Sequence, residues 1–190
     1  MYRTDVSEEF EPRTQGEHNN YGSVNPYLSR TAAMMVNIGL SDGQRDAAVR
    51  ILNIVLADEY VLYTKSRRFH WNVEGADFSE LHQVFENQYE RLARLVGRVA
   101  ERARALGGVA AGSLEEYLKL TRLKEEPDTR HDAREMIGAL LADHETLIRG
   151  LRKDLETCSK EHGDHGTTDF LTRLMRDHET IAWMLRAYTR

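Results

Sequence analysis

Apolar residues recur every three or four positions along most of the chain, which is the spacing of one face of an α-helix. This pattern predicts four long helices, over about 41–68, 79–106, 130–160 and 168–190, separated by Gly75, by Gly107-Gly108 and by Gly163 with Gly166. Only three prolines occur and none lies within residues 28–126, so no residue there forces a helix to stop. The sequence therefore predicts an all-α protein.

The connections predict how the helices pair. The first two helices are joined tightly, as are the last two, whereas residues 109–128 form a long crossover with a short helical piece, SLEEYLKL, at 113–120. Two hairpins joined by a crossover resemble the ferritin-like four-helix bundle. The echo of ADHETLIRGLR (142–152) in RDHETIAWMLR (176–186) suits two similar helices packed together. We expect one domain over 41–190.

Residues 1–40 differ in composition and are expected to form a polar, flexible N-terminal arm. Residues 1–30 hold five acidic and three basic side chains and no lysine, and the whole chain carries a formal charge of −5. This balance argues against a free-standing nucleic-acid binder, which needs a basic face. One cysteine excludes an internal disulfide, and there is no apolar run of membrane-spanning length. The polar first residues lack an apolar h-region, so a signal peptide is not expected. A cytoplasmic protein is expected.

The stretch FHWNVEGADFSELHQVFE (69–86) holds candidate metal ligands. His82 and Glu86 are four residues apart and so share a helix face, and His70 lies twelve residues before His82. Two interpretations stay open: part of a metal site, or two structural histidines near an acid. Imidazole and carboxylate ligands suit iron or zinc.

The usual di-iron centre inside a ferritin-like bundle takes Glu-x-x-His from two helices. None of the eight histidines has Glu three residues before it, so this centre is not expected. His144 and His178 are interpreted as structural residues, because the three side chains of each D-H-E point about 100° apart.

A further carboxylate, Glu101, is nineteen residues from His82 on the same predicted helix, or roughly 28 Å at ~1.5 Å per residue. It cannot reach a metal that His82 of the same chain holds. A second copy packed antiparallel would bring it there. A complete site is therefore expected between two subunits.

The segments LADEYVLYTKSRRFHWNVEGADFSELHQVFENQYERL (56–92) and AERARALGG (100–108) resemble the Dps family, the miniature ferritins named as DNA-binding proteins from starved cells. The resemblance covers about 37–189 and includes NIGLSDGQR and GTTDFLTRLMRDHETIAWMLRAY. It implies a four-helix subunit in a hollow dodecamer. It also implies Fe(II) oxidation between two-fold-related subunits, with hydrogen peroxide preferred over oxygen, and storage of ferric mineral.

By this resemblance His70, His82 and Glu86 come from one subunit and Glu101 from the other. From the ligand types, zinc is expected as a possible substitute for iron at the same site. The chain departs from the family at Gly97, where an aspartate ligand is expected. Glycine offers no ligand, so the resemblance implies a weakened or altered ferroxidase site.

Other residues also fit the family pattern, and each of them has an alternative interpretation. Trp71 is a candidate radical trap or an interface residue. Asp164 and Asp169 are candidates for an iron-entry pore at a three-fold axis, and His162 and His165 for a metal site there; a solvated turn and helix start is the alternative.

The acidic, lysine-free arm predicts weak or no DNA binding. The competing function is a cage with little ferroxidase activity that protects DNA and associates with the nucleoid, a reading that Gly97 favours and the arm opposes.

Overall fold

The computed structural model describes residues 36–126 and 132–189, and in these ranges every regular element is a helix. The helices are α1 (Asp42–Asn72), α2 (Phe78–Ala105), α3 (Leu114–Leu120), α4 (Ala133–Lys160) and α5 (His165–Ala187). The all-α, ferritin-like fold predicted from the pattern is confirmed, including the short helix in the crossover. The arm predicted for residues 1–40 lies outside the described residues except for 36–40.

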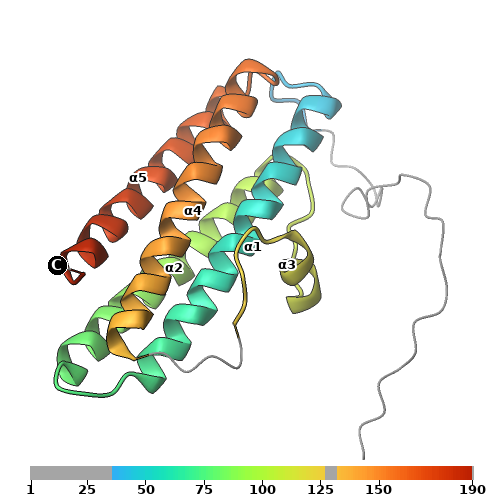
Figure 1. The fold of residues 1–190 in the computed structure, drawn as a ribbon. Helices are drawn as coiled ribbons and strands as arrows, with labels where there is room; N and C mark the ends of the chain where they lie inside the picture. Colours follow the sequence, from blue (N-terminus) through green and yellow to red (C-terminus); the bar gives the residue numbers. More distant parts are fainter. Residues whose placement is uncertain (1–35, 127–131, 190) are drawn as a thin grey trace, which may run out of the picture.

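The four long helices lie side by side in two antiparallel pairs, α1 with α2 and α4 with α5 (Figure 1). Because α2 and α4 run in the same direction, the chain between them returns along the bundle, on the outside of α1 where α3 packs (Figure 1). No helix in the described ranges is long and apolar enough to cross a membrane.

Three helices begin at capping boxes, which satisfy backbone N–H groups that a helix start leaves free. Ser41 pairs with Gln44 at α1, Ser113 with Glu116 at α3, and Asp132 with Glu135 at α4. These side chains set the starts of the helices within a few residues of the predicted positions.

The predicted start of the last helix, at Thr168, was three residues late. Gly163 adopts a positive φ of 60° and makes the turn, and the Asp164 carboxylate then accepts from the Thr167 N–H at 2.9 Å. This cap starts α5 at His165 and places Gly166 inside its first turn rather than in a helix break. A Cβ at Gly166 would lie 2.9 Å from Arg102 Nη2, so the glycine makes room for a guanidinium that also binds Asp164.

Buried charges tie the crossover to the bundle. The fully buried carboxylate of Asp58 on α1 accepts from Thr121 Oγ1 at 2.9 Å and from Arg122 N and Nε at 2.6 and 2.7 Å. Arg122 Nη1 also donates to Asp154 on α4 at 2.7 Å. Because each buried charge has partners, its desolvation is offset.

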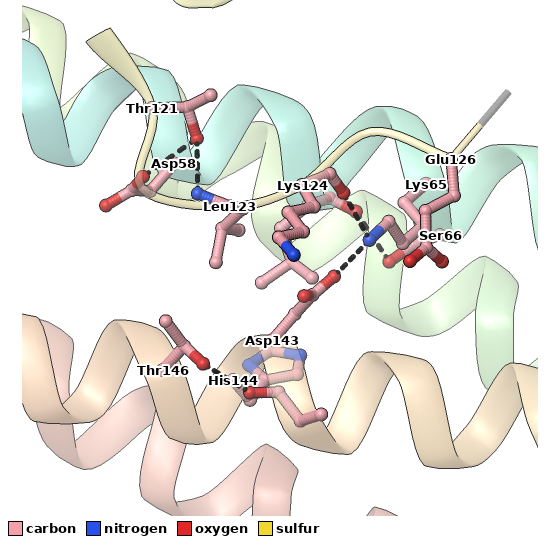
Figure 2. Close-up of polar contacts among 12 residues, drawn as sticks. Asp58, Lys65, Ser66, Thr121, Leu123, Lys124, Glu126, Asp143, His144 and Thr146 are labelled. Carbon is pink, nitrogen blue, oxygen red and sulfur yellow. Dashed lines mark hydrogen bonds and ion pairs between the residues drawn. The ribbon is translucent and has the colours of Figure 1, made fainter.

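A second tie lies further along α1 (Figure 2). Lys65 Nζ donates to the Lys124 carbonyl at 2.9 Å and to Asp143 on α4 at 2.5 Å. Lys65 is only 7% exposed, and burial raises the pKa of the Asp143 carboxyl. The two ties fix the crossover on one side of α1 and leave the other side for α2.

Candidate metal centre

Two histidines face each other where α1 ends and α2 begins. His70 lies in the last turn of α1 and His82 in the first turns of α2, and their rings stack with centroids 3.8 Å apart. The short turn through Gly75, whose φ is 110°, brings them together. The sequence predicted these residues as candidates, and the structure makes them neighbours.

The backbone fixes the tautomer of both rings. His70 Nδ1 lies 2.9 Å from the His82 carbonyl oxygen, and His82 Nδ1 lies 2.9 Å from the His70 carbonyl oxygen. Because a carbonyl can only accept, both Nδ1 atoms carry the hydrogen and both Nε2 atoms keep a lone pair when the rings are neutral. Backbone bonds of this kind orient metal-binding histidines in known sites.

Glu86 lies one turn beyond His82 on α2 and is half-buried. Its carboxylate accepts from Gln83 Nε2 at 3.0 Å. Burial and the negative charges of Glu86 and Glu90 raise the pKa of the Tyr89 phenol, whose ring packs edge-on against His70 at 5.3 Å. The site therefore offers two imidazole nitrogens and a carboxylate, a set that suits iron or zinc.

Glu101 and Gly97 lie far along α2 and are exposed to solvent. Glu101 is nineteen residues from His82, so the structure does not bring it to the histidines of its own chain. A Cβ built at Gly97 meets no atom within 4 Å, so a side chain would fit there. Within 36–126 and 132–189, no three His, Cys, Asp or Glu side chains of one chain are grouped so as to hold a metal ion, so His70, His82 and Glu86 do not form a complete site by themselves.

His144 and His178 lie inside the bundle and are fully buried. Their Nδ1 atoms are 2.9 Å apart, Gln88 Nε2 lies 2.8 Å from His144 Nε2, and His178 Nε2 lies 2.7 Å from a Glu59 carboxylate oxygen. These contacts form a line of hydrogen bonds across the four long helices. They do not form a metal site, in which the lone pairs of several ligands would point at one ion. Burial, with His178 and Arg91 nearby, holds the pKa of His144 well below its ordinary value.

Trp71 follows His70 and is 64% exposed. The guanidinium carbon of Arg67 lies 4.8 Å from the centre of its ring. The structure thus places the candidate radical trap beside the histidines, at the surface of the chain.

The four residues proposed for a pore or second metal site lie around the α4–α5 turn but do not share one environment. Asp164 is 2% exposed, and its carboxylate binds Thr167 and the Arg102 guanidinium. Asp169 is exposed and pairs with Arg173 at 2.9 Å. His165 is exposed and begins α5, and the backbone carbonyl of half-buried His162 accepts from Gln44. Asp164 is thus engaged as the helix cap.

Tyr89 is a neighbour of the site that was not predicted from the sequence. The signal was available, because Tyr89 follows His82 by seven residues and so lies on the same face of α2. The mutual bonding of the two histidines to each other's carbonyls had no such signal, since it depends on how the turn aligns two helices.

Comparison with known proteins adds evidence of a different kind. A ferritin-like domain matches residues 49–190. An uncharacterized low temperature-induced protein of Nostoc sp. is 46% identical over 153 residues, covering 80% of this chain and 86% of that protein. DNA protection during starvation protein 2 of Bacillus anthracis is 35% identical over 140 residues, covering 74% of this chain and 94% of that protein.

Solved structures agree with these relatives. DpsC from Streptomyces coelicolor has a TM-score of 0.79 at 29% identity, covering 83% of this chain and 92% of its own. A Dps protein from Vibrio cholerae has a TM-score of 0.77 at 34% identity, covering 84% of this chain and all of its own. The latter is described as a member of a broad superfamily of ferritin-like diiron-carboxylate proteins.

Proposed function

Because the chain belongs to the Dps group of ferritin-like proteins, we propose that it oxidises Fe(II) at sites shared between two copies of the chain. The ferric product is stored inside a closed homo-oligomer, a dodecamer in the cytoplasm. Fe(II) is bound by His70, His82 and Glu86 of one chain and Glu101 of the partner chain. Zinc is expected to compete for the same ligands.

The observation that carries this proposal is the pair of bonds from His70 and His82 to each other's backbone carbonyls. A structural histidine needs a partner at each ring nitrogen when buried. Here both rings are anchored through Nδ1, which leaves Nε2 as the metal-binding atom, with the Glu86 carboxylate one helical turn away. One peroxide takes two electrons, one from each of two Fe(II) ions, and is reduced to water with two protons; oxygen is the slower alternative.

Exposed apolar side chains support contact with a second copy. Leu114 and Leu118 on α3 are 65% and 59% exposed, and Trp71 beside the histidines is 64% exposed. Such side chains lose contact with water when copies associate. Association is also what would bring Glu101 of the partner chain to His70 and His82.

Iron oxidation followed by absorbance tests the proposal. Replacing His82 with alanine removes an Nε2 ligand and should slow Fe(II) oxidation at least about tenfold. Lys153→Ala, an exposed change on α4, is the control and should oxidise iron at the wild-type rate. Equal rates for wild type and His82→Ala would rule out this site.

Protection of DNA is the second candidate function, because relatives carry that name. The acidic balance of residues 1–30 opposes binding to phosphate. We expect no gel shift of duplex DNA at moderate salt. A clear shift that is lost when residues 1–30 are deleted would show that the arm binds DNA after all.

A further inference from the structure

Four tyrosine rings lead away from the histidine pair. Tyr89 packs edge-on against His70 with ring centres 5.3 Å apart, Tyr63 lies 6.3 Å from Tyr89, and Tyr60 lies 5.8 Å from Tyr63. Tyr60 then stacks on Tyr117 at 4.3 Å, with 22° between the planes. At such separations neighbouring aromatic rings are in contact. The rings Tyr89, Tyr63, Tyr60 and Tyr117, here called the tyrosine row, run without a gap from the site to α3.

The far end of the row is fixed by hydrogen bonds of the crossover. Tyr117 is 8% exposed and its hydroxyl donates to the Ala111 carbonyl at 3.1 Å. The Ala111 N–H in turn donates to the buried side chain of Asn53 on α1 at 2.9 Å. The Tyr60–Tyr117 stack is therefore held in place rather than formed by mobile surface rings.

Charge differs between the two ends of the row. The guanidinium of Arg67 lies over the rings of Tyr63 and Tyr89, 5.4 and 5.9 Å from their centres, and donates to the Tyr63 hydroxyl at 2.8 Å. A cation over a ring makes removal of an electron from that ring harder. At the other end the negative charge of Glu116 acts on Tyr117. An electron vacancy is thus favoured at Tyr60 and Tyr117 over Tyr63, whereas at Tyr89 the carboxylates of Glu86 and Glu90 act against Arg67.

We propose that the tyrosine row carries oxidising equivalents from the His70–His82 site to the Tyr60–Tyr117 stack. When Fe(II) and peroxide produce a hydroxyl radical, that radical takes one electron and one proton from Tyr89 and becomes water. Each neutral tyrosyl radical then takes an electron from the next tyrosine and a proton from solvent, and the newly oxidised tyrosine releases its phenolic proton; the rings of Tyr89, Tyr63 and Tyr60 are half-buried and so reach solvent. The radical ends on the stack, where half-buried Tyr60 can pass its phenolic proton to solvent.

The benefit is protection of the ligands. A radical formed at the site would otherwise attack His70 or His82, the residues on which binding depends. The iron chemistry in this inference rests on the proposed function, whereas transfer along the row depends only on the rings. The experiment therefore includes an oxidant that needs no iron.

The first arm treats the protein with Fe(II) and hydrogen peroxide and maps oxidised tyrosines by peptide mass spectrometry. In wild type, oxidation should concentrate at Tyr60 and Tyr117. In Tyr63→Phe, a ring too hard to oxidise interrupts the row, so oxidation of Tyr60 and Tyr117 should fall severalfold and that of Tyr89 should rise. Tyr188→Phe removes a tyrosine outside the row, bonded to Glu80, and should match wild type.

The second arm attaches a ruthenium photosensitiser to cysteine in the variant Gln83→Cys, on the exposed face beside His82. Burial raises the pKa of the native Cys158 thiol to about 12, so the label is directed to position 83. After a flash with a soluble electron acceptor, the oxidised ruthenium takes an electron from Tyr89, whose phenolic proton passes to solvent, and the tyrosyl radical is followed by its absorption.

A tyrosyl radical that appears at Tyr60 and Tyr117 after a delay, and is lost when Tyr63→Phe is added, supports transfer along the row. If this radical is seen but the protein does not oxidise iron, only the proposed function fails. An unchanged yield at Tyr60 and Tyr117 in Tyr63→Phe, in both arms, overturns the row. If Tyr63→Phe does not fold, Tyr89→Phe removes the first ring, and the same loss or its absence decides.

Discussion

The chemistry of the candidate site depends on single atoms. The Nδ1 hydrogens of His70 and His82 are held by carbonyl oxygens 2.9 Å away, which leaves both Nε2 atoms for a metal ion. The sequence indicated both histidines and Glu86 by their spacing. It did not indicate the carbonyl partners, because these depend on how the turn at Gly75 aligns α1 with α2.

Gly97 is the residue at which the chain departs from the family pattern, and it is exposed with open space around it. Gly97→Asp should fit without a clash and supply the expected carboxylate to the partner chain's histidines. We expect tighter Fe(II) binding, on the order of tenfold, and severalfold faster oxidation, measured by iron titration and absorbance.

Gly97→Ala is the matched control for that substitution. It removes the helix-propensity cost of glycine, about 1 kcal/mol and more than aspartate would recover, without adding a ligand. If Gly97→Asp oxidises iron no faster than Gly97→Ala, the missing carboxylate does not limit the site.

At the scale of the helices, the apolar period predicted each long helix, and side-chain caps explain where α1, α4 and α5 begin. The late start predicted for the last helix arose because two glycines suggested a break, whereas Asp164 caps the helix before the second of them. The Asp58–Arg122–Asp154 tie could not be predicted, since it joins α1, the crossover and α4 through contacts between distant residues.

Gly150 on α4 is required by that tie. A Cβ there would lie 2.4 Å from Arg122 Nη1, so Gly150→Ala should displace the guanidinium from its buried carboxylates. We expect a loss of about 1–3 kcal/mol in the free energy of unfolding, measured with urea. Gly138→Ala on the same helix meets open space and should instead stabilise by about 0.5–1 kcal/mol. Stabilisation by both changes would contradict the role given to Arg122.

At the scale of the whole molecule, the line of hydrogen bonds from Gln88 through His144 and His178 to Glu59 joins all four long helices. The repeated D-H-E of the sequence indicated that the two helices that contain it, α4 and α5, pack together, and they do. That the two histidines would bond to each other could not be foreseen, because it requires the registers of the two helices to match.

This buried line predicts a dependence of stability on pH. The pKa of His144 is well below its ordinary value in the folded chain, first because of burial, whereas the unfolded chain takes up a proton near pH 6.5. The stability is therefore present above about pH 6.5 and falls as pH drops below it, by up to about 1.4 kcal/mol per pH unit.

Urea unfolding between pH 7.5 and pH 5, about one unit or more to either side of the ordinary histidine pKa, would measure this slope. His144→Asn should have a smaller slope than wild type over the same range. Equal slopes in the two proteins would show that His144 does not cause the loss.

The central claim is that each metal site is shared by two chains, and co-assembly tests it most directly. Assemblies of His82→Ala alone and of Glu101→Gln alone should both oxidise Fe(II) slowly. When the two variants are unfolded together and refolded in equal amounts, half of the two-fold pairs are mixed, and each mixed pair regains one intact site of two. We expect the mixed assembly to recover about a quarter of the wild-type rate of iron oxidation. A mixed assembly no faster than the separate variants would contradict it.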